Sequence, residues 1–507
     1  MLKKNIIFLK GLVICVFYQS PLYAHNWRLT PSIQLQEIYS DNINLASADK
    51  AKSALVTSLS PAALIIWRVG KSSLNLRYTM QNLYNAQGNG DVTVFHQLQF
   101  NAHNVLSQNR LFVDSRSSIG QQNISNTRLA SDNLSGRTTT VTTFGISPTW
   151  LPHFGNYANG TVRVNADTFS SGANTSATGG LSDSETVSEI VQFNSGSKFK
   201  RIRWSAGFNN SQTYRTGGGD VSFQNSSVTL RTYLDKHFSV FATGGHSANH
   251  YVTQINGNPN SNNGFFYTFG GRWSPSTHYW LEAGGGNNSY ATVNISPMQR
   301  LSWLTTVRHN NIGLNSGTTW QTALNYRTRK SNWSLTHNNS TTTAQNLLSQ
   351  TGTGEPVIPI NNTILTNDII VVQSSNLSAS YYSGKSTFSL SGYLLDYAYQ
   401  LDPLNQQNQI KDQNIKGISG LWNWQFARKT SAYIRPLWQQ IDTTYANNIR
   451  SQGNRYDFAI GLNQTITNRI SGNLELRHVT QTSNAASTLL NSDYQENRAT
   501  ANLFMRF

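Results

Sequence analysis

The sequence is poor in cysteine, in charge and in long apolar runs. It has one cysteine in 507 residues, and only 12% of the residues are charged. That cysteine, Cys15, lies in an N-terminal segment that we expect to be cleaved, so the mature chain would have no disulfide and no thiolate metal site. Beyond this segment no apolar run approaches the roughly 20 residues of a membrane-spanning helix. These absences exclude a cysteine-stapled small domain and a helical membrane protein.

Catalytic signatures are also missing from the sequence. There is no His-Glu-x-x-His and no Gly-x-Ser-x-Gly motif, and the eleven histidines are dispersed. The segment 379–386 ends in Gly-Lys-Ser, as a phosphate-binding loop does, but it lacks the leading glycine of that motif. We therefore predict no catalytic residue, no metal site, no cofactor and no enzymatic activity. Since there is no compact basic domain, we also expect no nucleic-acid partner.

The N-terminus has the layout of a secretory signal peptide. Lys3 and Lys4 precede two mostly apolar stretches, 6–9 and 11–18, and Ala24 is a suitable last residue before cleavage. We predict a signal peptide over residues 1–24 and a single mature domain over 25–507. The alternative is a retained membrane anchor, although the apolar run is shorter than a bilayer span requires.

Apolar and polar residues alternate along most of the mature chain. In 74–84 the apolar face carries Leu74, Leu76, Tyr78, Met80 and Tyr84. Segments 455–463 and 469–477 alternate in the same way. A period of two, with a negative mean hydropathy, is typical of strands that face lipid on one side and a polar lumen on the other. The pattern predicts an all-β fold, a transmembrane antiparallel up-and-down β-barrel of about 22–24 strands.

The connections between these segments alternate in length. Short ones include 68–72, 198–201, 383–386 and 428–431, and longer Asn-, Ser- and Gly-rich ones include 40–54, 123–137, 170–185, 252–263, 345–366 and 400–412. Bacterial barrels have short periplasmic turns and long outer loops, and an even number of strands. The strand count is open at 291–316, where Leu301, Trp303 and Leu304 fit either a strand or a long loop. The expected location is the outer membrane, reached by export through the periplasm.

The chain ends in an amphipathic segment. Leu503, Met505 and Phe507 share one face, and Phe507 is terminal. Outer-membrane barrels commonly end in such a strand, which offers a free edge for pairing during assembly. We interpret these three residues as the signal that the barrel-assembly machinery reads. Outer-membrane lipid and this machinery are the first expected partners.

Basic residues dominate the charge of the chain. The predicted signal peptide carries three lysines and no acid, so the mature balance is 36 − 23 = +13. A charged side chain facing lipid near the midplane costs about 2–4 kcal/mol, which places strand charges inside the barrel. The candidate lumen-facing residues are Arg77, Arg163, Arg203, Arg327, Arg455, Arg477, Asp457 and Glu475. A positive lumen favours an anionic solute or polysaccharide, and the alternative is a purely structural ladder of arginines and acids in a plugged lumen.

Several segments, in this order, resemble a known family. Residues 31–45 read Pro-Ser-Ile-Gln-Leu-Gln-Glu-Ile-Tyr-Ser-Asp-Asn-Ile-Asn-Leu, followed by Ser-Leu-Ser-Pro at 58–61, Leu-Asn-Leu-Arg-Tyr at 74–78, and Tyr-Arg-Thr-Arg-Lys-Ser at 326–331 with Trp-Ser-Leu at 333–335. Together they resemble the outer-membrane β-barrel family associated with the PEP-CTERM/exosortase exopolysaccharide system. The resemblance covers most of the mature chain and implies a setting in exopolysaccharide production or export.

Three functions therefore compete at this point. The first is a non-enzymatic pore or accessory barrel for export of exopolysaccharide or anionic solute. The second is a structural or adhesive surface barrel whose lumen is closed. The third is an outer-membrane hydrolase whose serine and histidine come from different strands.

Overall fold

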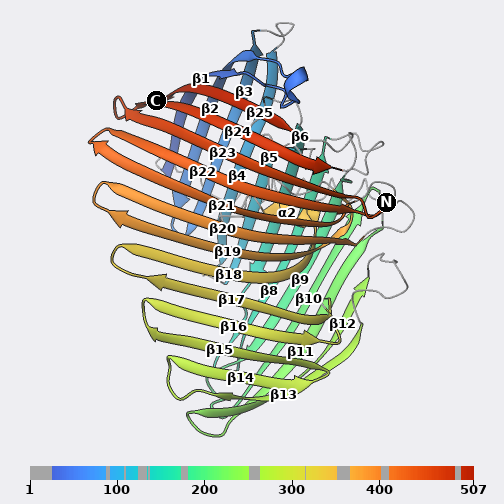
Figure 1. Cartoon of the computed structure of the whole chain (residues 1–507). Coiled ribbons are helices and arrows are strands. Elements are labelled where there is room, and N and C mark those ends of the chain that lie inside the picture. Colours follow the sequence, from blue (N-terminus) through green and yellow to red (C-terminus); the bar gives the residue numbers. More distant parts are fainter. Residues whose placement is uncertain are drawn as a thin grey trace.

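The computed structural model of the chain describes residues 26–86, 92–107, 110–123, 134, 138–172, 181–217, 219–250, 263–314, 316–350, 366–400, 410–485 and 493–507. The predicted signal peptide, 1–24, lies outside the described residues. Strands make up most of the described chain (Figure 1). A short 3₁₀ helix, η2 (Ala48–Lys50), and one short α-helix, α2 (Ala344–Gln350), accompany them.

The strands follow one another around a single closed sheet. They are β1 (Trp27–Ser40), β2 (Ala54–Val69), β3 (Ser72–Asn85), β4 (Val92–Ser107), β5 (Leu111–Asn123), β6 (Thr138–Trp150), β7 (His153–Phe154), β8 (Ala158–Ser171), β9 (Ser184–Ser195), β10 (Ile202–Arg215), β11 (Val221–Tyr233), β12 (Phe238–His250), β13 (Gly264–Trp273), β14 (Tyr279–Gly286), β15 (Asn288–Met298), β16 (Leu301–Asn310), β17 (Gly317–Arg327), β18 (Ser331–Thr343), β19 (Ile369–Ser383), β20 (Ser386–Gln400), β21 (Ile410–Ala427), β22 (Thr430–Tyr445), β23 (Arg450–Thr465), β24 (Ile470–Ala485) and β25 (Tyr494–Arg506).

The sheet closes because the first strand pairs with the last. β1 and β25 are antiparallel neighbours over nine residue pairs, from Ser32↔Arg506 to Ser40↔Arg498. The two-residue β7 pairs with β8 beyond the end of the β6–β8 pairing, so it does not count as a separate strand of the barrel. The result is a closed antiparallel barrel of 24 strands, which confirms the predicted fold class. An even strand number puts the first and the last strand residues, Trp27 and Arg506, at the same end of the barrel.

That end carries the short turns. Turns such as 70–71, 299–300, 384–385 and 428–429 join strands there, whereas longer segments such as 41–53 and 344–368 join them at the opposite end. The region 291–316, where the sequence left the strand count open, contains most of β15 and all of β16, joined by the turn at 299–300. Leu301, Trp303 and Leu304 belong to β16.

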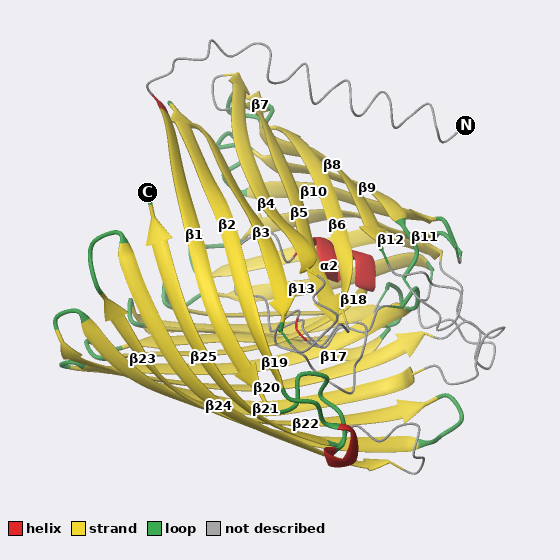
Figure 2. Cartoon of the chain, turned by 90° about the horizontal axis from the view of Figure 1, so that it is seen from above, coloured by secondary structure: helices red, strands yellow, loops and turns green. Residues whose placement is uncertain are grey.

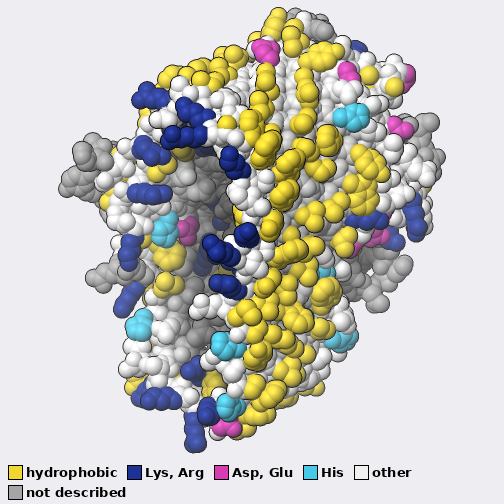
Figure 3. Space-filling model, turned by 60° about the vertical axis from the view of Figure 1, so that its left-hand side comes forward, with side chains coloured by type: hydrophobic (Ala, Val, Ile, Leu, Met, Phe, Trp, Pro, Cys, Tyr) yellow, Lys and Arg dark blue, Asp and Glu magenta, His cyan; other side chains and the backbone are white. Residues whose placement is uncertain are grey.

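Each strand has one apolar exposed face and one inner face. On β23, Tyr456 and Phe458 are 55% and 46% exposed, whereas Asp457 between them is 9% exposed. Large apolar side chains cover the outer wall in rows (Figure 3). Leu503 and Met505 of β25 pair in register with Leu35 and Ile33 of β1, within this outer surface. Exposed apolar rows around a closed antiparallel sheet are the surface that a bilayer covers in an outer-membrane barrel.

Part of the lumen is filled near the long-loop end. The sequence predicted a loop over 345–366, but α2 begins this connection, and Thr343 caps it by accepting the N–H of Asn346 (3.2 Å). In Figure 2, α2 lies inside the ring of strands. Ala344 belongs to a buried cluster that joins the two walls of the barrel, with Val141, Phe169 and Leu181 from one side and Ile370, Tyr397, Tyr399 and Ile415 from the other. No helix in the described part of the chain is long and apolar enough to span a membrane.

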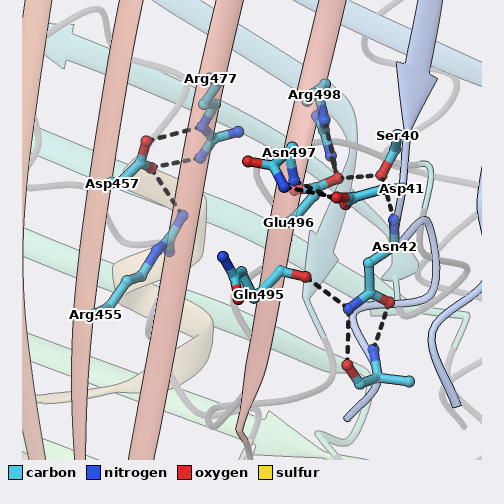
Figure 4. A network of polar contacts seen from close by, with 11 residues as sticks. Ser40, Asp41, Asn42, Arg455, Asp457, Arg477, Gln495, Glu496, Asn497 and Arg498 are labelled. Carbon is cyan, nitrogen blue, oxygen red and sulfur yellow. Dashed lines mark hydrogen bonds and ion pairs between the residues drawn. The ribbon is translucent and has the colours of Figure 1, made fainter. Parts of the chain in front are cut away.

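A polar clasp holds the seam between β1 and β25 at its long-loop end (Figure 4). Asn42 donates to the carbonyl oxygens of Ala46 (2.7 Å) and Gln495 (2.8 Å), and its own side-chain oxygen accepts the N–H of Ala46 (3.0 Å). Asp41 accepts two hydrogen bonds from Asn497, at 2.8 and 2.7 Å. Asp41 and Asn42 therefore fasten the first strand to the last.

The clasp predicts a matched pair of variants. Asn42→Ala leaves buried donors and acceptors unpaired, each worth about 1–3 kcal/mol, so the barrel should unfold at a clearly lower temperature. The partly exposed Asn44 makes two hydrogen bonds within the same loop, to Lys50 and Lys52. Asn44→Ala should therefore unfold at the same temperature as the unmodified protein. The measurement is the temperature at which the folded band converts to the unfolded band on a semi-native gel. Equal midpoints for the two variants would contradict the clasp.

Candidate functional site

The inner face of the barrel is rich in arginine. On each strand it is the face opposite the exposed apolar row, and register places on it Arg77, Arg116, Arg163, Arg203, Arg231, Arg272, Arg308, Arg327, Arg435, Arg455, Arg477 and Arg498. The strand acids on the same face are Asp114, Asp167, Glu282, Asp457, Glu475 and Glu496. The interior of the described barrel therefore carries an excess of positive charge.

Four of these arginines form a ladder with three acids on β22–β25: Arg435, Arg455, Arg477 and Arg498 with Asp457, Glu475 and Glu496. Figure 4 shows the part of this ladder on β23–β25. Asp457 of β23 accepts hydrogen bonds from Nε (2.9 Å) and Nη2 (2.5 Å) of Arg477. It also accepts one from Nη2 of Arg455 (3.1 Å). The three side chains are only 8–11% exposed. A buried carboxylate between two guanidinium groups has its charge balanced and most of its oxygen lone pairs occupied, so this part of the ladder is a fixed section of wall.

The remaining members of the arginine ladder flank this centre. Glu496 accepts Arg498 (2.7 Å) and the hydroxyl of Ser40 (2.7 Å), which ties the ladder to the seam. Glu475 accepts the hydroxyl of Tyr433 at 2.5 Å, while Arg435 lies 3.6 Å away. Arg435 is 48% exposed, unlike its neighbours. With four arginines and three acids the ladder has a net charge of 4 − 3 = +1, and Arg435 is its accessible cation.

The structure divides the residues predicted from the sequence into two groups. Arg455, Arg477, Asp457 and Glu475 meet in the ladder. Arg77, Arg203 and Arg327 are exposed, lie on other walls, and form no ion pair with a described residue. Arg203 lies over the ring of Tyr233 at 5.1 Å, and Arg163 donates to Asn165 (2.8 Å). The second group can offer charge to a solute, whereas the buried centre of the ladder cannot.

Other ion pairs lie on strands that sequence reasoning did not single out. Arg116 on β5 bonds to Asp167 on β8 (2.5 Å), and Arg231 on β11 reaches Glu282 on β14 (2.8 Å). The partners come from strands two or three places apart. Alternation placed such residues inside, but the sequence held no signal for which strands would be neighbours in register.

Glycine on the intervening strand allows some inner side chains to contact a partner two strands away. Gly145 lies in register between Arg116 and Asp167, and a Cβ there would overlap the Asp167 carboxylate. Gly461 lies in the same way between Tyr433 and Glu475, directly under the tyrosine ring. Where the middle strand has no side chain, a long side chain lies flat on the wall and bonds to the strand beyond.

A latch near the long-loop end connects opposite walls. Its centre is Asn367, in the segment just before β19. Asn367 exchanges hydrogen bonds with Ser182 (2.9 and 2.8 Å) next to β9, accepts Gln345 of α2 (3.2 Å), and receives Arg215 at the end of β10 on its backbone oxygen (2.6 Å). β9 and β10 lie far around the ring from β18 and β19. The Asn367 latch therefore spans the lumen and holds Asn367 against the opposite wall.

The described residues contain no group of three or more His, Asp or Glu side chains arranged to hold a metal ion. His103 pairs with Asp114 (2.7 Å) on the inner face and packs against Phe112. Guanidinium, amide and hydroxyl groups along the described inner wall offer ion pairing and hydrogen bonding.

No family model and no curated protein matches the sequence. Similar solved structures include the siderophore receptor PirA from Acinetobacter baumannii, with a TM-score of 0.47, 9% identity, and 95% of this chain and 80% of that chain covered. The FrpB iron transporter from Neisseria meningitidis (F3-3 variant) gives 0.45, 10%, 95% and 81%, and OccK2 from Pseudomonas aeruginosa gives 0.34, 8%, 94% and 98%. Likenesses this distant say nothing about cargo.

The glycine positions give a second test of the inner wall. Gly145→Ala should separate Arg116 from Asp167 and lower the free energy of unfolding by about 1–3 kcal/mol through overpacking. Gly120 lies on the same inner face of β5, and a Cβ added there would meet no atom within 4 Å. Gly120→Ala should therefore change stability little. Urea unfolding of the refolded barrel, followed by tryptophan fluorescence, measures both. A Gly145→Ala barrel as stable as the Gly120→Ala barrel would refute the packing argument.

Proposed function

We propose that this outer-membrane barrel takes anionic solutes or acidic polysaccharide into its lumen and exports them without catalysing a reaction. The observation that carries the proposal is the excess of inner-face arginines over inner-face acids. A cleft lined with charge of one sign and walled by low-dielectric protein focuses the field on ions of the opposite sign. Because the acids in the ladder are already bound, Arg77, Arg203, Arg327 and Arg435 remain to attract an anion.

Arginine is well suited to a polymeric acid. Its planar guanidinium can bond a carboxylate or phosphate at two points and stays charged at any physiological pH. Arg203 and Arg327 lie close to the short-turn end of their strands, and Arg435 lies deeper. Several weak sites along the wall would let an acidic chain advance from one site to the next without binding tightly to any.

A link to exopolysaccharide export is part of this proposal and rests on the family resemblance. Asp41 and Asn42, within the segment 31–45 that carries part of the resemblance, act in the seam clasp. This motif therefore supports a barrel architecture and not a cargo. Support for polysaccharide comes from the arginine-rich wall. The neighbouring genes would be informative: genes for glycan synthesis and export beside this one are expected, and their absence would count against the link.

The closed-lumen barrel remains the second candidate, and the Asn367 latch favours it. A connection that crosses the lumen and packs into a buried cluster narrows the long-loop end. The Asn367 latch itself is held by hydrogen bonds, so it also fits a pore whose outer end opens during transport. Conductance distinguishes the two candidates.

Anion selectivity tests the leading proposal. In a planar bilayer with a KCl gradient, the refolded barrel should show a reversal potential of the sign for chloride preference. The triple variant Arg77→Gln, Arg203→Gln and Arg327→Gln should shift that potential toward zero, because it removes exposed inner charge. Arg450→Gln, at the outer long-loop end of β23, is the control and should leave it unchanged. Cation preference in the unmodified barrel would overturn the proposal.

The latch generates a separate prediction. Asn367→Ala removes the hydrogen bonds to Ser182 and Gln345, so the crossing connection should leave its place more often and single-channel conductance should rise at least twofold. Asn75→Ala, an exposed inner-face position near the short-turn end, should conduct like the unmodified barrel. If neither the unmodified barrel nor Asn367→Ala conducts ions, the structural or adhesive barrel is the better description.

A further inference from the structure

A pocket of about 860 Å³ opens on the inner wall between β8 and β16, away from the arginine ladder. Its volume falls within the roughly 300–1,000 Å³ of small-molecule sites. Amide and hydroxyl side chains dominate its lining, among them Asn209, Asn225, Thr229, Thr243 and Ser247. A wall of this kind offers hydrogen-bond donors and acceptors at short intervals.

Two amides in this pocket are available to a ligand. Asn209 and Asn225 face each other in register on β10 and β11, and both are exposed. Neither side chain forms a hydrogen bond with another described residue, unlike the nearby hydroxyls of Thr229 and Thr243, which bond to each other at 2.9 Å. An amide pair presents two NH₂ donors and two carbonyl acceptors, which suits adjacent hydroxyl groups on a sugar ring.

Aromatic rings supply flat surfaces beside these amides. Phe266 on β13 pairs in register with Gly245 on β12, and a Cβ on that glycine would overlap the Phe266 ring. The ring therefore lies against the wall with its other face toward the lumen. Tyr290 on β15 also lines the pocket, stacked on Phe241 with ring centroids 5.8 Å apart and bonded to Glu282 at 2.7 Å. The C–H face of a sugar ring packs on such surfaces.

One cation faces the pocket. Arg308 on β16 pairs in register with Tyr290, is exposed, and forms no ion pair with a described residue. Glu189 borders the pocket too, but it pairs with Val164, an exposed residue of the outer face, so its carboxylate points away from the lumen. The charge offered to a ligand is therefore that of Arg308.

We infer that this pocket binds a short stretch of an acidic oligosaccharide. Phe266 and Tyr290 would hold sugar rings, Asn209 and Asn225 would bond their hydroxyls, and Arg308 would bond a carboxylate on one ring. The inference deepens the proposed function by giving the polysaccharide a defined stopping place. It does not depend on conduction, because a barrel that passes no current can still bind a sugar in its lumen.

The test measures binding to the full-length mature barrel, refolded in detergent, by isothermal titration calorimetry. The probes are tetragalacturonate, which is acidic, and maltotetraose, which is neutral. We expect tetragalacturonate to bind more tightly than maltotetraose. Arg308→Gln should weaken tetragalacturonate about tenfold, the effect of losing roughly one charge-assisted hydrogen bond, and should leave maltotetraose unchanged. Asn225→Ala should weaken both probes.

Matched controls on other walls separate this site from general attraction between charges. Arg450→Gln, at the outer long-loop end of β23, and Asn75→Ala, on the inner face of β3, should bind both probes like the unmodified barrel. Gel conversion temperature checks that every variant is folded. If Arg450→Gln weakens tetragalacturonate binding as much as Arg308→Gln does, or if neither probe binds, the pocket is not the site. Anion selectivity is measured separately, so the proposed function and this inference can fail independently.

Discussion

Every part of this structure depends on satisfying backbone hydrogen bonds in lipid. Inside a bilayer no water is available to an unpaired N–H or C=O, so a sheet that crosses it must have no free edge. The pairing of β1 with β25 meets this requirement. From it follow the even strand number, the common end of the two terminal strands, and the separation of an apolar outer face from a polar lumen. The seam clasp of Asp41, Asn42 and Asn497 secures the contact on which the rest depends.

The same constraint explains why the inner wall has two kinds of arginine. A guanidinium group enclosed by protein requires a partner, and neighbouring inner positions on alternate strands are too far apart for short side chains. Glycine on the strand between lets Arg116 meet Asp167, and lets Tyr433 meet Glu475. Arginines that face open lumen need no such partner, since water solvates them. Pairing therefore makes one group structural, whereas Arg77, Arg203 and Arg327 stay exposed on the inner face.

The two ends of the lumen differ in what they offer. Near the long loops, the Asn367 latch and a buried apolar cluster connect opposite walls. The amide-lined pocket between β8 and β16 and the exposed arginines provide neutral and charged contacts along the wall. A polymer that is both polyhydroxylated and acidic could use both kinds of contact, whereas a small inorganic anion would use only the arginines. The arginine-rich wall and the pocket are therefore suited to the same kind of polymer.

The sequence by itself determined the class of fold and the inward side of most strands, because both follow from a period of two and from the cost of charge in lipid. It also located the short turns and came within the correct range of strand number, with the doubt confined to 291–316. Only the tertiary structure decided which inner residues meet. Arg116 and Asp167 are 51 residues apart, and register, not local pattern, brings them together. The crossing of α2 and the position of Asn367 were decided in the same way, since residues 182, 215 and 367 become neighbours only when the sheet closes.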